Sequence, residues 1–223
     1  MSAREEVLAR IAAAHRTAAP PELAYENVVR DYRTESDRGS KELNECLVDR
    51  LIDYRALVRR CSADDLAGTI ASALAERGAR TVVVPAGLDQ SWLAGVPVDV
   101  RMDGPTADDQ LSVAELDRTD GVITTCAVAV AETGTLILDG SADQGRRVIT
   151  LIPDYHLCVV LPGQIVSDVP QAVRRLTPTR PLTMISGPSA TSDIELNRVE
   201  GVHGPRTLEV IIVDPSAEPS QEN

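Results

Sequence analysis

The stretch Leu66–Val84, LAGTIASALAERGARTVVV, changes the period of its hydrophobic pattern halfway along. Leu66, Ile70 and Leu74 recur every four residues, which places them on one face of a helix. The run 81–84 is short, apolar and rich in β-branched residues, as is typical of a strand buried in a parallel sheet. A helix followed at once by such a strand indicates an α/β fold.

Similar runs continue this pattern in both directions. We predict further strands over residues 96–100, 121–125, 135–139, 147–152, 157–161, 182–186 and 208–213, and helices over 112–118 and 167–176. Near the N-terminus, Ser2 and Glu5 have the spacing of a capping box, and apolar residues at helical spacing predict an amphipathic helix over 41–60. Because no helix separates the strands within 121–161, we expect hairpins or a sheet extension there.

These elements divide the chain into three segments. Residues 1–60 form a predicted N-terminal helical region that packs on the core, and residues 61–214 form a predicted α/β domain with an open sheet. Residues 215–223 are polar and are predicted to be a disordered tail.

Composition restricts the function. The chain has 22 basic and 34 acidic residues, a formal net charge of −12, whereas a nucleic-acid surface needs clustered positive charge. We therefore expect no nucleic-acid partner. No apolar run approaches the length of a membrane span, and the N-terminus lacks the apolar core of a secretory signal. We expect a cytoplasmic protein without a transmembrane segment.

The four cysteines are too widely spaced for a local metal or cluster motif. Cys46, Cys61, Cys126 and Cys158 form no CxxC pair, which excludes a zinc ribbon or a local iron–sulfur cradle. We expect reduced thiols, no bound metal and no cofactor in this chain.

Glycine and small polar residues gather in four loops, 131–135, 139–147, 186–195 and 201–206, each just after a predicted strand. Ligands of open α/β sheets bind beyond the carboxyl ends of the strands. A single loop of this kind is explained by tight turns, but four of them favour one shared pocket for a small anionic ligand, a carboxylate or phosphate. Three arginines offer charge-assisted hydrogen bonds to it: Arg146, Arg147 and Arg206.

Three titratable residues are candidates for catalysis. Glu132 interrupts an apolar run, so it is either a general acid/base or nucleophile, or it ties down loop amides. His156 follows Asp154 by two residues; the two side chains either orient each other for proton transfer or serve a turn and a structural hydrogen bond. His203 lies two residues after one glycine and directly before another, where a ligand can approach the backbone.

The remaining predicted ligand contacts are small or acidic residues of the same loops: Thr133, Gly134, Thr135, Ser186, Gly187, Ser189, Asp193, Glu195 and Gly204. An alternative for the third loop is structural. If it begins a helix, Ser189 or Thr191 caps that helix, and the acidic residues that follow favour its positive end.

Five motifs in a fixed order carry a resemblance to a known family: AETGTLILDG (131–140), QGRR (144–147), PDYH (153–156), SGPSATSDIE (186–195) and GVHGPRTLEVIIVD (201–214). Together they resemble the LUD-domain family and, within it, the short lactate-utilization protein C members. The resemblance runs from about Gly121 to Asp214. It implies that 61–214 is a LUD-type domain whose open sheet is similar to that of the NagB/RpiA/CoA-transferase-like group.

The resemblance also implies a function. Members of the family take part in oxidising L-lactate to pyruvate beside two partner proteins that hold iron–sulfur clusters. This chain lacks the cysteine array of those partners, so the resemblance implies the cluster-free component.

Two other functions remain open. Glu132-Thr133-Gly134 has the form of the Glu-x-Gly turn that carries the nucleophile in CoA transferases of related fold, which gives a stand-alone acyl- or CoA-transferase-like enzyme. A non-catalytic assembly subunit, in contrast, uses the apolar face of the helix predicted over 41–60 to dock a partner.

Overall fold

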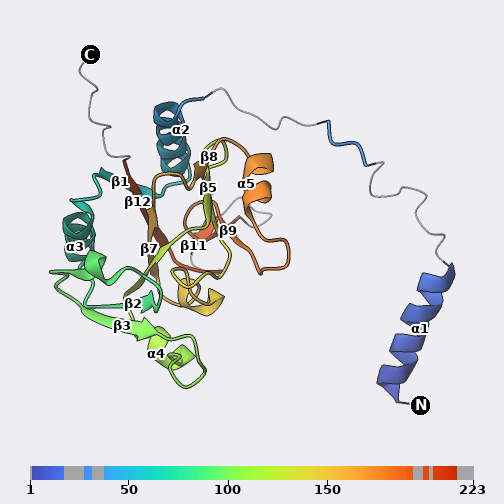
Figure 1. The fold of residues 1–223 in the computed structure, drawn as a ribbon. Coiled ribbons are helices and arrows are strands. Elements are labelled where there is room, and N and C mark those ends of the chain that lie inside the picture. The colour runs from blue at the N-terminus through green and yellow to red at the C-terminus, as the bar shows by residue number, and fades with distance from the viewer. Residues whose placement is uncertain (1, 18–27, 32–37, 193–197, 201–202, 215–223) are drawn as a thin grey trace. The chain divides into compact units, whose positions relative to one another are not determined.

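The computed structural model describes residues 2–17, 28–31, 38–192, 198–200 and 203–214, in two compact units, 1–33 and 34–223 (Figure 1). The first unit contains the helix α1 (Ala3–Thr17). Its capping box is formed as predicted: the amide of Ser2 donates to Glu5 Oε2 at 2.7 Å, and the amide of Glu5 donates to Ser2 Oγ at 3.3 Å. No described helix is long and apolar enough to span a membrane.

The second unit is built on a parallel sheet, which confirms the predicted α/β class. In the described residues this sheet has six strands in the order β1-β12-β7-β4-β2-β3. Their bounds are β1 (Leu57–Cys61), β2 (Thr81–Pro85), β3 (Asp99–Asp103), β4 (Gly121–Thr125), β7 (Tyr155–Val160) and β12 (Thr207–Val213). All neighbouring strands in it run parallel. Its likeness to the NagB/RpiA/CoA-transferase-like group stays a prediction.

A second, separate sheet contains the hairpin that was one of the two arrangements expected within 121–161. In order, its four strands among the described residues are β8 (Ile165–Val166), β5 (Val128–Val130), β6 (Thr135–Leu138) and β9 (Thr183–Ile185). The pairs β5–β6 and β6–β9 are antiparallel, whereas β5 and β8 run parallel. A separate antiparallel pair follows, β10 (Ala190–Ser192) with β11 (Arg198–Glu200).

The central sheet is covered on both faces (Figure 1). On one face, α3 (Leu66–Arg77) and the 3₁₀ turn η2 (Gln90–Leu93) bury the apolar side chains of β2, β4, β7 and β12. On the other face lie α2 (Ser40–Asp53) and the second sheet, on which α5 (Val169–Arg175) packs. The 3₁₀ turn η3 (Arg147–Thr150) and α4 (Val113–Leu116) complete this face by packing on β2 and β4.

The structure corrects three of the elements that were predicted from the sequence. The helix predicted over 41–60 ends at Asp53, because Arg55 adopts a positive φ of 65° and the chain turns into the edge strand β1. Residues 147–150 form the turn η3 instead of a strand, because Ile149 packs down onto the sheet and its amide bonds to the carbonyl of Arg146. The strand predicted over 96–100 lies at 99–103.

Helix α2 packs directly on the turn before β6. Gly134, in this turn, has φ +59°, and a Cβ added to it would lie 2.9 Å from Arg50 Cβ and 3.1 Å from the Arg50 carbonyl carbon. Gly163 also has a positive φ, +84°, but an added Cβ there would meet no atom within 4 Å.

These two glycines allow a matched test of that packing. Gly163→Ala should cost about 1–2 kcal/mol of unfolding free energy from backbone strain alone. Gly134→Ala should cost about 1–3 kcal/mol more, because the new Cβ also overlaps α2. Urea unfolding of the two variants measures the difference. If the two variants lose equal unfolding free energy, α2 does not pack closely on the turn at Gly134.

Candidate functional site

A cavity of about 260 Å³ lies over the first residues of β7 and β12, beside η3 and β9. We call it the histidine cavity, because both His156 and His203 line it. It brings together a set of the predicted site residues: Arg147, His156, Ser186, Gly187, Ser189, His203 and Gly204. Its place on the sheet differs from the expected one, since it lies over the beginnings of two strands and not beyond their carboxyl ends.

His156 connects this cavity to the buried sheet. It is the second residue of β7 and only 1 % exposed, and its Nε2 lies 2.8 Å from the hydroxyl of Thr124 on β4. Burial lowers the pKa of His156 to about 4, so the ring is neutral near pH 7. Its other nitrogen, Nδ1, makes no hydrogen bond to any described residue, which leaves it for a ligand in the cavity.

Of the two arrangements considered for Asp154 and His156, a hydrogen bond between them is not formed: His156 bonds Thr124 and Asp154 bonds Arg206. Asp154 Oδ1 accepts a hydrogen bond from Arg206 Nε at 2.7 Å. Partial burial opposes ionisation of the Asp154 carboxyl. Hydrogen bonding from Arg206 nevertheless holds the pKa of Asp154 below its ordinary value. Arg206 thus binds a carboxylate of its own chain, and it lines neither this cavity nor the second one described below.

Two loops are tied together at the rim. The amide of His203 donates to Ser189 Oγ at 3.1 Å, and the amide of Ser189 donates to the carbonyl of Pro205 at 2.8 Å. The exposed ring of His203 lies on this tied rim. Directly after Ser189, residues 190–192 form the strand β10 and not the start of the helix considered there. Asp193 and Glu195 lie outside the described residues.

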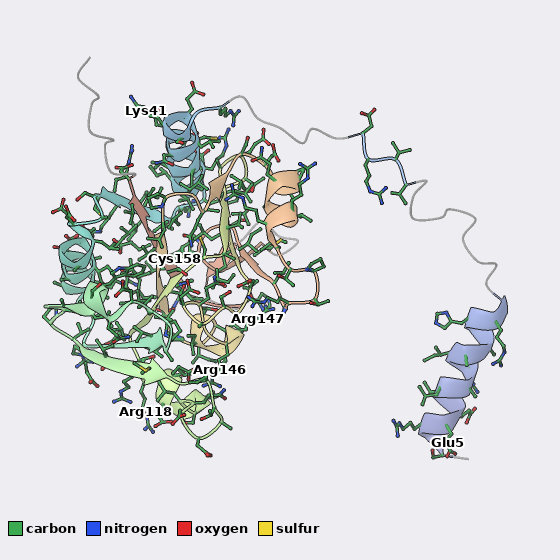
Figure 2. The ribbon with its side chains drawn as sticks, in the orientation of Figure 1. Glu5, Lys41, Arg118, Arg146, Arg147 and Cys158 are labelled. Atoms are coloured by element: carbon green, nitrogen blue, oxygen red, sulfur yellow. The ribbon has the colours of Figure 1, made fainter. Side chains whose placement is uncertain are left out.

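Arg147 supplies positive charge. It is exposed, it begins η3, and its guanidinium makes no hydrogen bond or ion pair with any described residue. It lines the histidine cavity and also a second cavity, of about 480 Å³, at the ends of β2 and β3. We call the second one the arginine cavity, because it is lined by both Arg146 and Arg147, which are labelled in Figure 2. The two cavities share three lining residues: Arg147, Thr150 and Thr183.

The loop 139–147 fills the crevice at which an open α/β sheet ordinarily binds its ligand. The chain leaves β2 toward β3 on one side and leaves β4 for β7 on the other, so the order of strands reverses between β2 and β4. There the amide of Gly87 donates to the carbonyl of Ala142 at 2.9 Å, and Thr125 Oγ1 donates to Asp143. A Cβ on Gly87 would lie 2.5 Å from Ala142 Cβ, so glycine is needed for this close approach.

Glu132 lies apart from both cavities. With Thr133 it borders a shallow depression against α2, and its amide donates to the carbonyl of Ser167 at 3.0 Å. A chain of hydroxyls leads from this turn to the histidine cavity: Thr133 Oγ1 lies 2.7 Å from Thr135 Oγ1, which lies 2.8 Å from Ser186 Oγ. The four predicted loops therefore do not line one common pocket.

Sequence reasoning missed Thr124, the hydrogen-bond partner of His156, and several residues that line the two cavities. Thr124 is a hydroxyl within an apolar strand, which is the signal by which it could have been found. Asp103, Thr150 and Thr183 carry no such signal, since each reaches its cavity through the folding of distant segments. Among the described residues, no three His, Cys, Asp or Glu side chains gather as a metal site.

The buried histidine should make stability depend on pH. The unfolded chain protonates His156 near pH 6.5, whereas the folded one does so near pH 4. The stabilisation from neutral His156 is thus complete above about pH 6.5 and is lost as the pH falls to about 4, by about 3 kcal/mol. Urea unfolding at pH 7 and at pH 4 measures how much unfolding free energy each chain loses between these two pH values. This loss should be smaller in His156→Gln than in the native chain by about 3 kcal/mol.

The matched control is His15→Gln, on an exposed position of α1, which should follow the native pH dependence. Parallel stability curves for the native chain and His156→Gln would contradict the burial of a neutral ring.

Known proteins resemble this chain over most of its length. It matches the LUD domain family over residues 58–213. Lactate utilization protein C of Deinococcus radiodurans is 56% identical over 169 residues, 74% of this chain and 76% of that protein. The protein of the same name from Halalkalibacterium halodurans is 30% identical over 193 residues, 80% and 82% of the two chains. The crystal structure of a DUF162 family protein from Deinococcus radiodurans is 46% identical, with a TM-score of 0.68 over 79% of this chain and 99% of that one. This chain belongs to the LUD domain family.

Proposed function

We propose that this protein is a cytoplasmic component of the system that oxidises L-lactate to pyruvate, and that the histidine cavity holds the substrate. Relatives that are named lactate utilization protein C support the lactate role. The observation that carries the site is Arg147, a guanidinium without a partner among the described residues, in one cavity with two histidines. A planar guanidinium suits a carboxylate, to which it donates two parallel hydrogen bonds.

The two histidines suit different tasks at the substrate hydroxyl. His156 is neutral near pH 7 and has Nδ1 left for a hydrogen bond, so it orients the hydroxyl without adding charge. His203 is exposed on the rim, and there it accepts the hydroxyl proton and passes it to solvent. Oxidation to pyruvate removes two protons, this one and that of the C–H bond on the carbon that bears the hydroxyl, together with two electrons.

The two electrons need a carrier outside this chain. Its four cysteines include no CxxC pair, and among the described residues they gather in no metal site. We therefore place the electron carriers on partner proteins with iron–sulfur clusters. The isolated chain should accordingly oxidise little or no L-lactate.

Complementation of a deletion strain tests this function. Extracts are assayed for L-lactate-dependent reduction of an artificial electron acceptor. The native gene should restore the rate, and Arg147→Gln should lower it about 10- to 100-fold, because it loses a charge-assisted hydrogen bond of about 1.5–3 kcal/mol. Arg118→Gln is the matched control, since Arg118 is also exposed but lies beside α4 and lines neither cavity (Figure 2).

Two outcomes would refute parts of the proposal. An unchanged rate in the deletion strain rejects the lactate role, and full activity of a folded Arg147→Gln rejects the carboxylate site. Glu132→Gln should restore the rate, because Glu132 lies outside the histidine cavity. Loss of activity in that variant, with a covalent Glu132 adduct after incubation with acyl-CoA, would favour the transferase alternative.

A further inference from the structure

The arginine cavity contains a guanidinium that is fixed in place. Arg146 Nε donates to Asp103 Oδ2 and its Nη2 donates to Asp103 Oδ1, both at 2.7 Å, and Nη2 also donates to the carbonyl of Leu111. The carboxylate is held in turn by the amide of Leu111, at 2.9 Å from Oδ1. The Asp103 side chain is only 2 % exposed, whereas that of Arg146 is 31 % exposed. One edge of the guanidinium is therefore bound to protein while the rest of it lines the cavity.

The remaining donors of Arg146 have no partner among the residues that the structure describes. Nη1 makes no hydrogen bond to any described residue, so its two N–H groups are left for a ligand. Arg147 lines the same cavity and also has no described partner. Asp103 neutralises one of the two arginines, and it is the acidic residue of the lining. The cavity thus has an excess positive charge in a chain whose net charge is −12.

Part of the lining of this cavity is apolar. Leu138, Pro181 and Leu182 line it, and the volume of about 480 Å³ lies within the range of pockets that hold organic ligands. A water molecule takes about 30 Å³ in the liquid, so an inorganic anion alone would leave most of the cavity unfilled. A lining that combines two arginines with apolar side chains favours a ligand with an anionic end and an apolar body.

We infer that the arginine cavity is a second ligand site, distinct from the proposed lactate site, for an organic anion. The anionic group, a phosphate or carboxylate, accepts hydrogen bonds from Arg146 Nη1 and from the guanidinium of Arg147. The apolar body lies against Leu138 and Leu182. Asp103 holds Arg146 in the orientation that presents Nη1, so no rearrangement of that side chain is needed on binding.

Calorimetric titration of the full-length chain tests this site with three related probes: phenyl phosphate, phenylacetate and benzyl alcohol. We expect one molecule of an anionic probe to bind per chain, at least 10-fold more tightly than the neutral alcohol. Tighter binding of phenyl phosphate identifies a phosphate ligand, and tighter binding of phenylacetate identifies a carboxylate ligand.

Two variants locate the binding. The double variant Asp103→Asn/Arg146→Gln removes Nη1 without leaving a buried carboxylate unpaired, and it keeps the net charge of the pair. This double variant should weaken binding of the anionic probe at least 10-fold. Leu182→Trp places a larger side chain in the lining and leaves both residues of the ion pair unchanged, and it should abolish binding of the probe. Ser189→Ala, in the histidine cavity only, should bind as the native chain does.

The inference is overturned if neither anion binds to the native chain, or if the alcohol binds as tightly as the anions. It is also overturned if the folded double variant and Leu182→Trp both bind normally. None of these measurements involves lactate oxidation. The probes can therefore fail to bind while the proposed function holds, and they can bind while the proposed function is rejected.

Discussion

The burial of β7 on both faces is the constraint on which the rest of this structure depends. All six of its residues are buried between β4 and β12. A polar side chain in such a strand must find a partner within the protein. His156 meets this demand with the hydroxyl of Thr124 and by remaining neutral, while Tyr155, on the other face, donates to Glu209 Oε2 at 2.8 Å.

Other buried polar side chains on the Tyr155 face of the sheet also need partners within the protein. Glu209 is 2 % exposed, and Arg59 on β1 pairs with it while also bonding Glu76 on α3 at 2.7 Å. This network joins an edge strand, two central strands and a helix, so it fixes the covering layer on that face. On the opposite face the polar residue of β7 instead reaches a cavity, and this difference separates the structural side of the sheet from the side available to ligands.

The features that sequence reasoning predicted are those that neighbouring residues determine. The strands at 81–84 and 121–125 and the capping box of Ser2 and Glu5 follow from local pattern, and the structure confirms them. The strand β1 was missed because Val58 continues the helical spacing of α2, and the partners of Arg59 lie 17 and 150 residues away. No local pattern contains such pairings.

The candidate site shows the same limit. The loops rich in glycine were recognised, and several of their residues do meet in the histidine cavity. Which loops would meet depended on long-range contacts, above all on the insertion of Ala142 against Gly87 at the ends of β2 and β4. That insertion occupies the crevice at which a doubly wound sheet ordinarily binds its ligand, and the cavities lie beside it instead.

Arg147 stands in the wall between two cavities, and its one guanidinium serves both of them. An anion that draws this group toward one side removes a hydrogen-bond donor from the other. Occupants of the two cavities are then antagonists, and thermodynamic reciprocity requires each to weaken the affinity of the other by the same factor. A single side chain would in this way let a ligand in one cavity reduce binding in the other cavity, with no movement of the backbone.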